Sequence, residues 1–149
     1  KQVVTSDREC VVFNEKGKVS AMKLGDHQAQ VINYASGKLS KVKYAAQTVQ
    51  EFQYISGMLA AVKTVGEDYS AYYEMFNYKS GLPTSVKIEN NAYGISEQGI
   101  CRVTYTKFDT NGNWTECQWT GKMKYKENGG TTPTERDYSR IITREISYY

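Results

Sequence analysis

Hydrophobic and polar positions alternate along most of this chain, and glycines in short polar stretches interrupt the alternation. One unit recurs: an aromatic residue, a short turn ending in a glycine, and an apolar residue two positions later. Its clearest copy runs from Tyr34 to Tyr44. Because glycine adopts positive φ without strain, and because β-prone runs flank each copy, the unit predicts a β-hairpin. The glycines of the five copies are Gly17, Gly37, Gly57, Gly81 and Gly112.

The spacing between the aromatic and the glycine predicts how each hairpin pairs. Three copies leave two residues between them, which suits a three-residue loop, and the other two leave three residues, which suits a four-residue loop. In both cases the aromatic would pair with the residue directly after the glycine, as Tyr34 with Lys38. Counting outward from that pair places Ile32 opposite Ser40.

Side chains alternate between the two faces of a strand, so the register sorts them. One face collects Tyr34, Ile32, Val42 and Tyr44, and we expect it to cover a core. From the other copies the same face takes Val11, Phe13, Met22, Leu24, Phe52, Tyr54, Val62, Phe76, Tyr78, Val86, Ile88, Phe108, Cys117 and Trp119.

The opposite face carries a lysine six residues after four of the glycines: Lys23, Lys43, Lys63 and Lys87. These lysines indicate a solvated face that resists edge pairing and aggregation. A basic stripe for an anionic partner is the alternative, and it would be diluted by the interleaved Glu51, Glu74 and Gln50.

No segment longer than about ten residues shows helical periodicity. The chain therefore predicts an all-β fold, an antiparallel meander of about ten to eleven hairpin-linked strands in a strongly curled sheet or barrel. Residues 1–149 are expected to form a single β-hairpin-repeat domain. The stretch Lys1–Asp7 is expected to be a frayed leader or an edge, and Asp137–Tyr149 a closing strand.

Composition narrows the classes of function. The 13 tyrosines suit a half-buried sheet surface. The net charge of +3 is ordinary and argues neither for nor against a nucleic-acid partner, and we do not expect one. No apolar segment is long enough to span a membrane. The three cysteines, Cys10, Cys101 and Cys117, are expected to be small buried hydrophobes, with Cys117 facing Thr104 and a disulfide involving Cys10 left open.

The sequence contains no catalytic motif. His27 is the only histidine, beside Asp26 in a predicted turn, and is expected to be solvated. With dispersed cysteines there is no metal-ligand cluster, and we expect no metal and no cofactor. A glycosidase would need two carboxylates facing one cleft, which a sequence cannot show.

Aromatic side chains that the inward face does not claim are the best candidates for ligand binding, because they can stack on a sugar or an extended peptide. At the position of Trp114 the other copies carry an aliphatic residue or a proline, so packing is the alternative role there. The candidates are Trp114, Tyr72, Tyr73, Tyr93 and Tyr125.

The fifth copy, Phe108-Asp109-Thr110-Asn111-Gly112-Asn113-Trp114, resembles the YD-repeat (RHS-type) hairpins, whose pattern is Tyr-Asp-x-x-Gly-Arg/Asn-Leu followed by a strand. The resemblance covers Phe13 to about Trp119, although the other four copies replace the acidic residue. The chain end also resembles tyrosine-rich secreted or lipoprotein-type proteins of Bacteroides-like bacteria. The resemblance implies a scaffold role, a secreted, periplasmic or cell-surface location and a lipid anchor on a segment before Lys1. It carries over no catalytic residue.

Three hypotheses of function follow. The first is a non-enzymatic cell-envelope or secreted β-repeat module that acts as a scaffold or binds a protein or a glycan. The second is a carrier of a small lipophile, which requires that the strands close into a barrel with a hollow apolar interior. The third is a hydrolase with an acidic site that no motif reveals.

Overall fold

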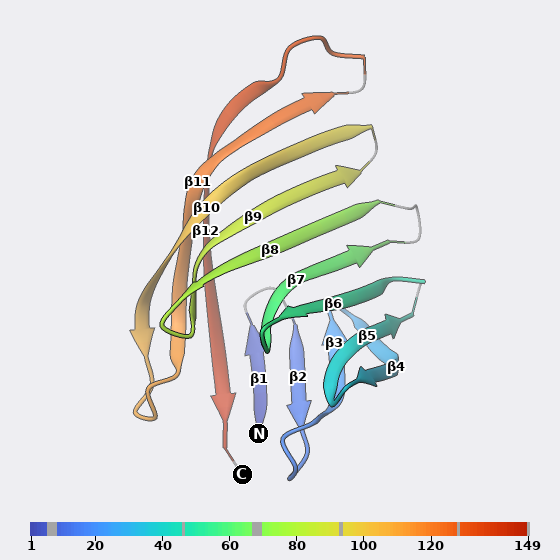
Figure 1. Cartoon of the computed structure of the whole chain (residues 1–149), viewed down its shortest axis with the longest axis vertical. Helices are drawn as coiled ribbons and strands as arrows, with labels where there is room; N and C mark the ends of the chain where they lie inside the picture. The colour runs from blue at the N-terminus through green and yellow to red at the C-terminus, as the bar shows by residue number, and fades with distance from the viewer. Residues whose placement is uncertain (6–8, 46, 67–69, 93, 128, 149) are drawn as a thin grey trace.

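The computed structural model describes residues 1–5, 9–45, 47–66, 70–92, 94–127 and 129–148. In these residues it forms twelve antiparallel strands, each paired with the next, and β1 also pairs with β12 to close a barrel (Figure 1). The predicted all-β meander is confirmed in its barrel form. The strands are β1 (Gln2–Thr5), β2 (Cys10–Phe13), β3 (Val19–Leu24), β4 (His27–Ala35), β5 (Lys38–Tyr44), β6 (Val49–Ile55), β7 (Met58–Val65), β8 (Ala71–Lys79), β9 (Leu82–Ala92), β10 (Ile95–Phe108), β11 (Trp114–Glu127) and β12 (Thr134–Ser147).

The strand count exceeds the predicted ten to eleven because the chain start is a strand. Val3 of β1 pairs with Val11 of β2 on one side and with Ile146 of β12 on the other. The prediction of a frayed leader was therefore wrong for residues 2–5. Although β1 is short, it has backbone partners on both sides. This double pairing removes the two free edges that an open sheet would have. The described part of the chain contains no helix long and apolar enough to cross a membrane.

The hairpin loops are each one residue shorter than predicted. In the second hairpin Ala35 pairs with Lys38, and the two loop residues Ser36 and Gly37 have φ of 50° and 76°. Two successive positive φ values define a type I′ turn, whose twist matches that of the flanking strands. The hairpins at Gly57 and Gly81 repeat this serine–glycine turn.

The first and fifth hairpins use a three-residue loop instead. Asn14 and Lys18 close the first loop, and the Gly17 amide donates to the Asn14 carbonyl at 2.9 Å. Asp109 and Asn113 close the fifth in the same way. All of the predicted turn glycines have positive φ: Gly17, Gly37, Gly57, Gly81 and Gly112.

A β-bulge follows each short loop and corrects the predicted register. In the second hairpin Tyr34 pairs with Leu39 and Asn33 with Lys41, which leaves Ser40 as an extra residue. The predicted pairs of Tyr34 with Lys38 and of Ile32 with Ser40 were therefore wrong. The bulge shifts the strand by one residue and turns Leu39 inward together with Tyr34. Val42 pairs with Ile32 and keeps its predicted inward side. The shorter loop and the bulge each shift the register by one residue, and a total shift of two residues leaves a side chain on the same face.

Tyrosines next to the turns join one hairpin to the next. The Tyr34 hydroxyl donates to the Val19 carbonyl of the preceding hairpin at 2.9 Å, and the Tyr105 hydroxyl donates to the Pro83 carbonyl at 2.9 Å. A lysine after the turn covers the next ring, with Lys18 Nζ 5.5 Å from the Tyr34 ring centroid. A phenylalanine could pack in this place but could not donate the hydrogen bond, which explains the preference for tyrosine.

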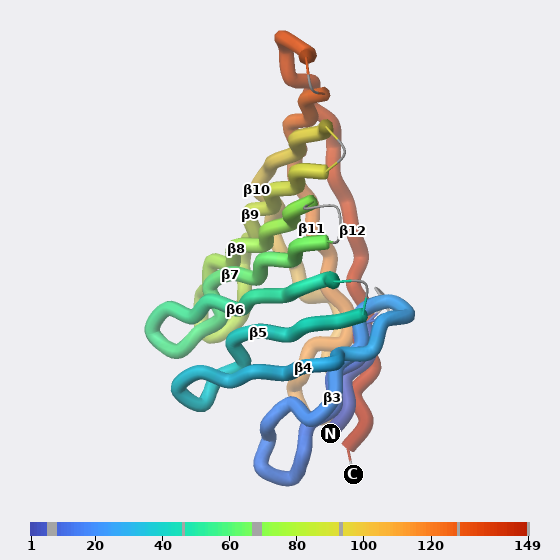
Figure 2. The backbone as a smooth tube through the Cα atoms, turned by 90° about the vertical axis from the view of Figure 1, so that its right-hand side faces the viewer, coloured from blue at the N-terminus to red at the C-terminus, as the bar shows by residue number. Residues whose placement is uncertain are grey.

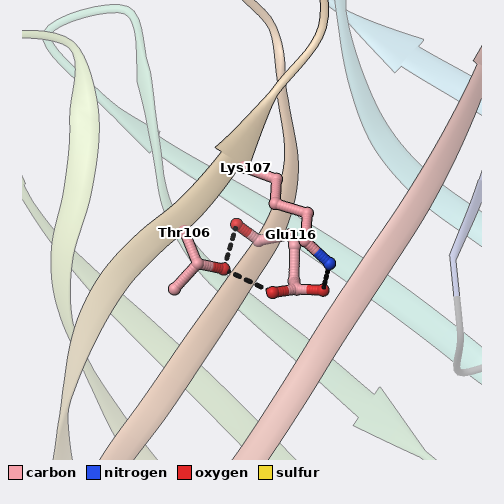
Figure 3. A network of polar contacts seen from close by, with 3 residues as sticks. All are labelled: Thr106, Lys107 and Glu116. Carbon is pink, nitrogen blue, oxygen red and sulfur yellow. Dashed lines mark hydrogen bonds and ion pairs between the residues drawn. The ribbon is translucent and has the colours of Figure 1, made fainter.

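The fifth hairpin is irregular on both strands. Thr106 and Thr115 are each unpaired extra residues, so that Lys107 pairs with Glu116 and Phe108 with Trp114. Figure 3 shows how polar contacts hold this region: Thr106 Oγ1 donates to Glu116 Oε1 at 2.7 Å, and Lys107 Nζ lies 2.6 Å from Glu116 Oε2. The bond from Lys107 is the main cause that lowers the pKa of Glu116.

The shifts in this hairpin also change which side chains are buried. Cys117 faces Tyr105 rather than Thr104. Phe108, predicted to be inward, is exposed, while Cys117 and Trp119 are buried as predicted. The three cysteines form no disulfide, and of these Cys10 is only half-buried.

Two groups of buried side chains occupy different parts of the barrel. The Val86 cluster lies between the long strands and consists of Val86, Ile88, Cys101, Val103, Cys117, Trp119, Met123 and Ile142. The Val42 cluster lies between the short strands and consists of Met22, Val42 and Tyr44. Figure 1 shows the long strands β10 to β12 extending well beyond the short strands β1 to β5, which gives the barrel a tapered shape.

The outer face carries polar groups of mixed charge, as the solvated-face interpretation predicts, together with exposed apolar side chains such as Ile100 and Ile141. Lys41 and Glu51 lie opposite one another on β5 and β6 with Nζ and Oε1 2.8 Å apart. Two residues assigned to this face by the sequence lie inside instead: Gln50 is buried and Glu74 lines the interior. Both share the inward parity of Phe52 and Phe76, so alternation of side chains explains the correction.

Candidate functional site

A cavity of about 660 Å³ lies inside the barrel between the two buried clusters. Its walls come from β2, β3, β5, β6, β7, β8 and β12. Eight strands already enclose enough space for side chains to fill, so a twelve-stranded barrel leaves part of its interior empty unless other elements fill it. In this barrel the Val86 cluster fills the side of the long strands, and the cavity remains beside the short ones.

The end of the cavity next to the glycine hairpins is apolar. Every second turn of a meander lies on the same side, so the glycine hairpins share one end of the barrel. We call this end the tip end. Figure 2 shows the turns that follow β2, β4 and β6 on one side of the molecule. The side chains near these turns that line the cavity are Phe13, Val19, Leu39, Tyr54 and Leu59. Val62, Phe52 and Phe76 continue the apolar wall inward.

The opposite end of the cavity carries hydrogen-bonding groups. Gln50 is only 6% exposed, and its Oε1 accepts a hydrogen bond from the Tyr44 hydroxyl at 2.6 Å. Its Nε2 donates to Thr64 Oγ1 at 3.4 Å. Burial, followed by the negative charge of Glu9, raises the pKa of Tyr44, so this phenol stays protonated and keeps donating. Such a satisfied network gives the cavity a rigid polar wall.

An ion pair spans the interior beside this polar wall. Arg140 Nη1 of β12 lies 3.8 Å from Glu74 Oε1 of β8, and the Tyr72 hydroxyl donates to the same oxygen at 3.1 Å. The Arg140 guanidinium lies 5.4 Å from the Trp119 ring centroid. Burial, and then Glu74, raises the pKa of Tyr72. An arginine and a carboxylate that are both largely shielded from water offer a polar ligand strong directional contacts.

The structure separates the aromatic residues that the sequence proposed for ligand binding. Tyr72 lines the cavity, whereas Tyr73 lies outside it with Lys63 Nζ 5.5 Å from its ring centroid. The Trp114 ring stacks on Arg144 at 3.8 Å and packs against the Val86 cluster. Tyr125 lies near the far end of β11, where its hydroxyl donates to Glu127 at 3.1 Å. Tyr93 lies outside the described residues.

Sequence reasoning missed the polar residues of the cavity. Gln50 lies two positions before Phe52, and Arg140 lies between Tyr138 and Ile142, so each is a polar residue at an inward position of an alternating strand. Such positions cost free energy unless the group is paired, which makes them informative. The sequence interpretation placed Gln50 on the lysine face and did not single out Arg140.

The site offers little for metal or acid chemistry. In the part of the chain that the structure describes, no group of three or more His, Cys, Asp or Glu side chains could hold a metal ion. Glu9 and Glu74 both line the cavity, which is the arrangement that the hydrolase hypothesis requires. Glu74 is also paired with Arg140 and accepts a hydrogen bond from the Tyr72 hydroxyl.

No family model matches the chain, and no curated protein matches it. The resemblance to YD-repeat hairpins therefore stays a prediction.

Proposed function

We propose that this protein is a carrier that holds one small amphiphile inside its barrel. The apolar tail lies beside Phe52 and Leu59, and the polar head group lies against Gln50, Glu74 and Arg140. One observation carries this proposal: the tip end of the cavity is lined by apolar side chains, whereas the polar side chains Gln50, Thr64 and Glu9 lie toward the other end, beside Leu24. Its volume of about 660 Å³ falls within the range of roughly 300–1,000 Å³ that small-molecule sites occupy.

The sorted lining favours an amphiphile over a purely apolar compound. A hydrocarbon in this cavity would leave Arg140 and Glu74 facing a group that cannot hydrogen-bond, which costs free energy. A head group with both donors and acceptors could add hydrogen bonds to the Arg140 guanidinium and the Glu74 carboxylate, which already pair with each other. The hollow interior also supports the lipophile-carrier hypothesis, since Phe52 and Phe76, which pack against the two clusters, border the cavity as well.

The other expectations stay predictions. A scaffold role, a protein or glycan partner and a location at the cell envelope rest on the hairpin resemblance. The expectation that the protein is not an enzyme rests on the missing catalytic motifs. The hydrolase hypothesis would require turnover that disappears when Glu9 and Glu74 are each replaced by glutamine.

A cavity-filling variant tests the carrier role. Val62→Trp places a large ring in the cavity, while Gln53→Trp adds the same ring on the exposed outer face of the neighbouring strand. Titration with cis-parinaric acid, followed by its fluorescence, should show saturable binding to the natural protein and to Gln53→Trp, and loss of binding in Val62→Trp. Absence of saturable binding to the natural protein, or equal binding to all three, would refute the proposal.

The same probe tests where the head group lies. Glu74→Gln removes the carboxylate beside Arg140 and should tighten binding of the negatively charged probe about tenfold, which corresponds to roughly 1.4 kcal/mol of relieved repulsion. Thr104→Gln, on an exposed position of β10, is the control and should leave the affinity unchanged. An affinity that Glu74→Gln leaves unchanged would place the head group elsewhere.

A further inference from the structure

Lysine side chains gather at the tip end of the barrel. The alternating turns of the meander bring them there from strands that are distant in sequence, and a further lysine comes from the start of β1. Some of these lysines lie over aromatic rings: Lys38 Nζ, for example, lies 5.2 Å from the Tyr54 ring centroid. A cation over a ring keeps its positive charge, so these contacts do not neutralise the surface. The tip-end lysines are Lys1, Lys16, Lys18, Lys38, Lys79 and Lys107.

Acidic groups offset this charge only in part. Glu15 lies in the first loop. In the fifth, the Asp109 carboxylate accepts hydrogen bonds from the Asn113 amide at 2.8 Å and the Tyr148 hydroxyl at 2.8 Å. Glu116 neutralises Lys107 locally, as its carboxylate lies 2.6 Å away. The lysines of the first, second and fourth hairpins therefore give the tip end its positive charge.

Large apolar side chains are exposed at the same end. Ile55 is 69% exposed and Met58 is 45% exposed, and they flank the turn of the third hairpin directly. Phe108, beside the turn of the fifth hairpin, is 52% exposed. Exposed apolar groups within a basic surface are the combination that interfacial membrane binding uses, because the apolar groups enter the lipid while lysines meet the head groups.

We propose that the tip end docks on a bilayer that contains anionic lipid, and that the amphiphile enters the barrel from there. This inference rests on the proposed carrier role for the direction of loading. A lipid leaving the bilayer toward the protein moves head first, so its head would reach Arg140 and Glu74 while its tail stays beside Phe13 and Leu59. The cavity is arranged in the same order, with apolar side chains near the tip end and polar ones further inside.

The route from the surface into the cavity passes Phe13. A surface hollow at the tip end is lined by Lys1, Phe13, Asn14, Glu15 and Lys16, and Phe13 also lines the interior cavity. Phe13 therefore borders both the hollow and the interior cavity. Lys1 and Lys16 at the rim of this hollow place positive charge where an anionic or zwitterionic head group would first arrive.

Vesicle co-sedimentation tests the docking surface. The natural protein should sediment with vesicles of phosphatidylcholine and phosphatidylglycerol and not with phosphatidylcholine alone. The triple variant Lys16→Gln, Lys38→Gln, Lys79→Gln should lower the partition coefficient on the order of a hundredfold, since each lysine near an anionic surface contributes roughly fivefold. The double variant Ile55→Ser, Met58→Ser should also lower binding.

Matched controls lie on the barrel wall. Lys23→Gln with Lys43→Gln removes exposed lysines of the outer face, and Ile100→Ser with Ile141→Ser removes side chains that are 63% and 60% exposed there. Both controls should sediment like the natural protein. Equal losses of binding in the controls and the tip variants would overturn the proposal. An absence of preference for the anionic vesicles would also overturn it, and this is the result expected if the tip end binds a protein instead of a membrane.

The two proposals can fail separately. Val62→Trp should sediment with anionic vesicles as the natural protein does, because the ring lies inside the barrel. If Val62→Trp sediments but natural protein does not bind cis-parinaric acid, the docking surface stands and the carrier role falls. If the natural protein binds the probe but ignores the vesicles, the carrier role stands and the docking surface falls.

Discussion

Gly121 leaves no room for a side chain between two strands beside the Val86 cluster, and Gly121→Ala should be strongly destabilising. Gly121 of β11 pairs with Cys101 of β10. A Cβ at this position would lie 2.3 Å from the Ile100 carbonyl oxygen and 3.0 Å from the Cys101 Cα. Ordinary carbon–oxygen contacts between strands are about 3.3 Å or longer, so the backbones would have to separate by about 1 Å.

The cost of this separation can be estimated. Moving one backbone away from its partner weakens the ladder hydrogen bonds on both sides of the pair, and each buried group left unpaired costs about 1–3 kcal/mol. Overpacking in a filled core costs a similar amount. We therefore expect Gly121→Ala to lower the free energy of unfolding by about 3–5 kcal/mol, a large part of the 5–15 kcal/mol typical of folded proteins.

Gly37→Ala is the matched comparison. Gly37 has φ of 76°, and an added Cβ would meet nothing within 4 Å. The substitution therefore costs only the strain of the left-handed backbone, about 1–2 kcal/mol. The neighbouring Ser36 already adopts φ of 50°, which shows that this turn accepts a side chain with positive φ.

Urea unfolding measures the difference between the two variants. Trp119 is buried in the Val86 cluster, which also contains Cys101, the residue that pairs with Gly121. The fluorescence of Trp119 therefore reports the unfolding of this part of the barrel. The midpoint should fall much further for Gly121→Ala than for Gly37→Ala at an unchanged slope. A loss for Gly121→Ala that is no larger than the loss for Gly37→Ala would refute the account of strand contact at Gly121.

Two further predictions concern the tyrosines. Tyr34→Phe removes the hydrogen bond to the Val19 carbonyl and should lower the free energy of unfolding by about 1 kcal/mol in urea titrations, whereas Tyr73→Phe, on the outer face, should have little effect. Burial raises the pKa of Tyr105 from 10.0 to about 12, so the folded state holds this proton more tightly than the unfolded state does. The resulting stability is complete below pH 10 and is lost as the pH rises toward about 12, so the urea midpoint should fall across this window and fall less in Tyr105→Phe. An equally steep fall in both proteins would show that Tyr105 is not responsible.

The sequence predicted the local pattern well because that pattern depends on neighbouring residues. Strand alternation and the glycine turns follow from backbone sterics, and they predicted the inward side of Val42, Phe52 and Phe76. The register failed by one residue at each turn, because serine–glycine can form a two-residue turn that is followed by a bulge at Ser40. Both arrangements leave Val42 on the same side, so the hydrophobic pattern could not distinguish them.

Barrel closure was determined only by the tertiary structure. Pairing of β1 with β12 depends on how twist and strand number bring the two ends of the meander together, and no local signal in residues 2–5 reports this. The candidate site depends on the same closure. Glu74 and Arg140 come from β8 and β12, on opposite walls, and meet because the closed barrel is hollow between its two clusters. The sequence alone determined the inward side of strand positions such as Val42 and Phe52, whereas the turns, the bulges and long-range closure decided the rest and whether these side chains meet a filled core or a cavity.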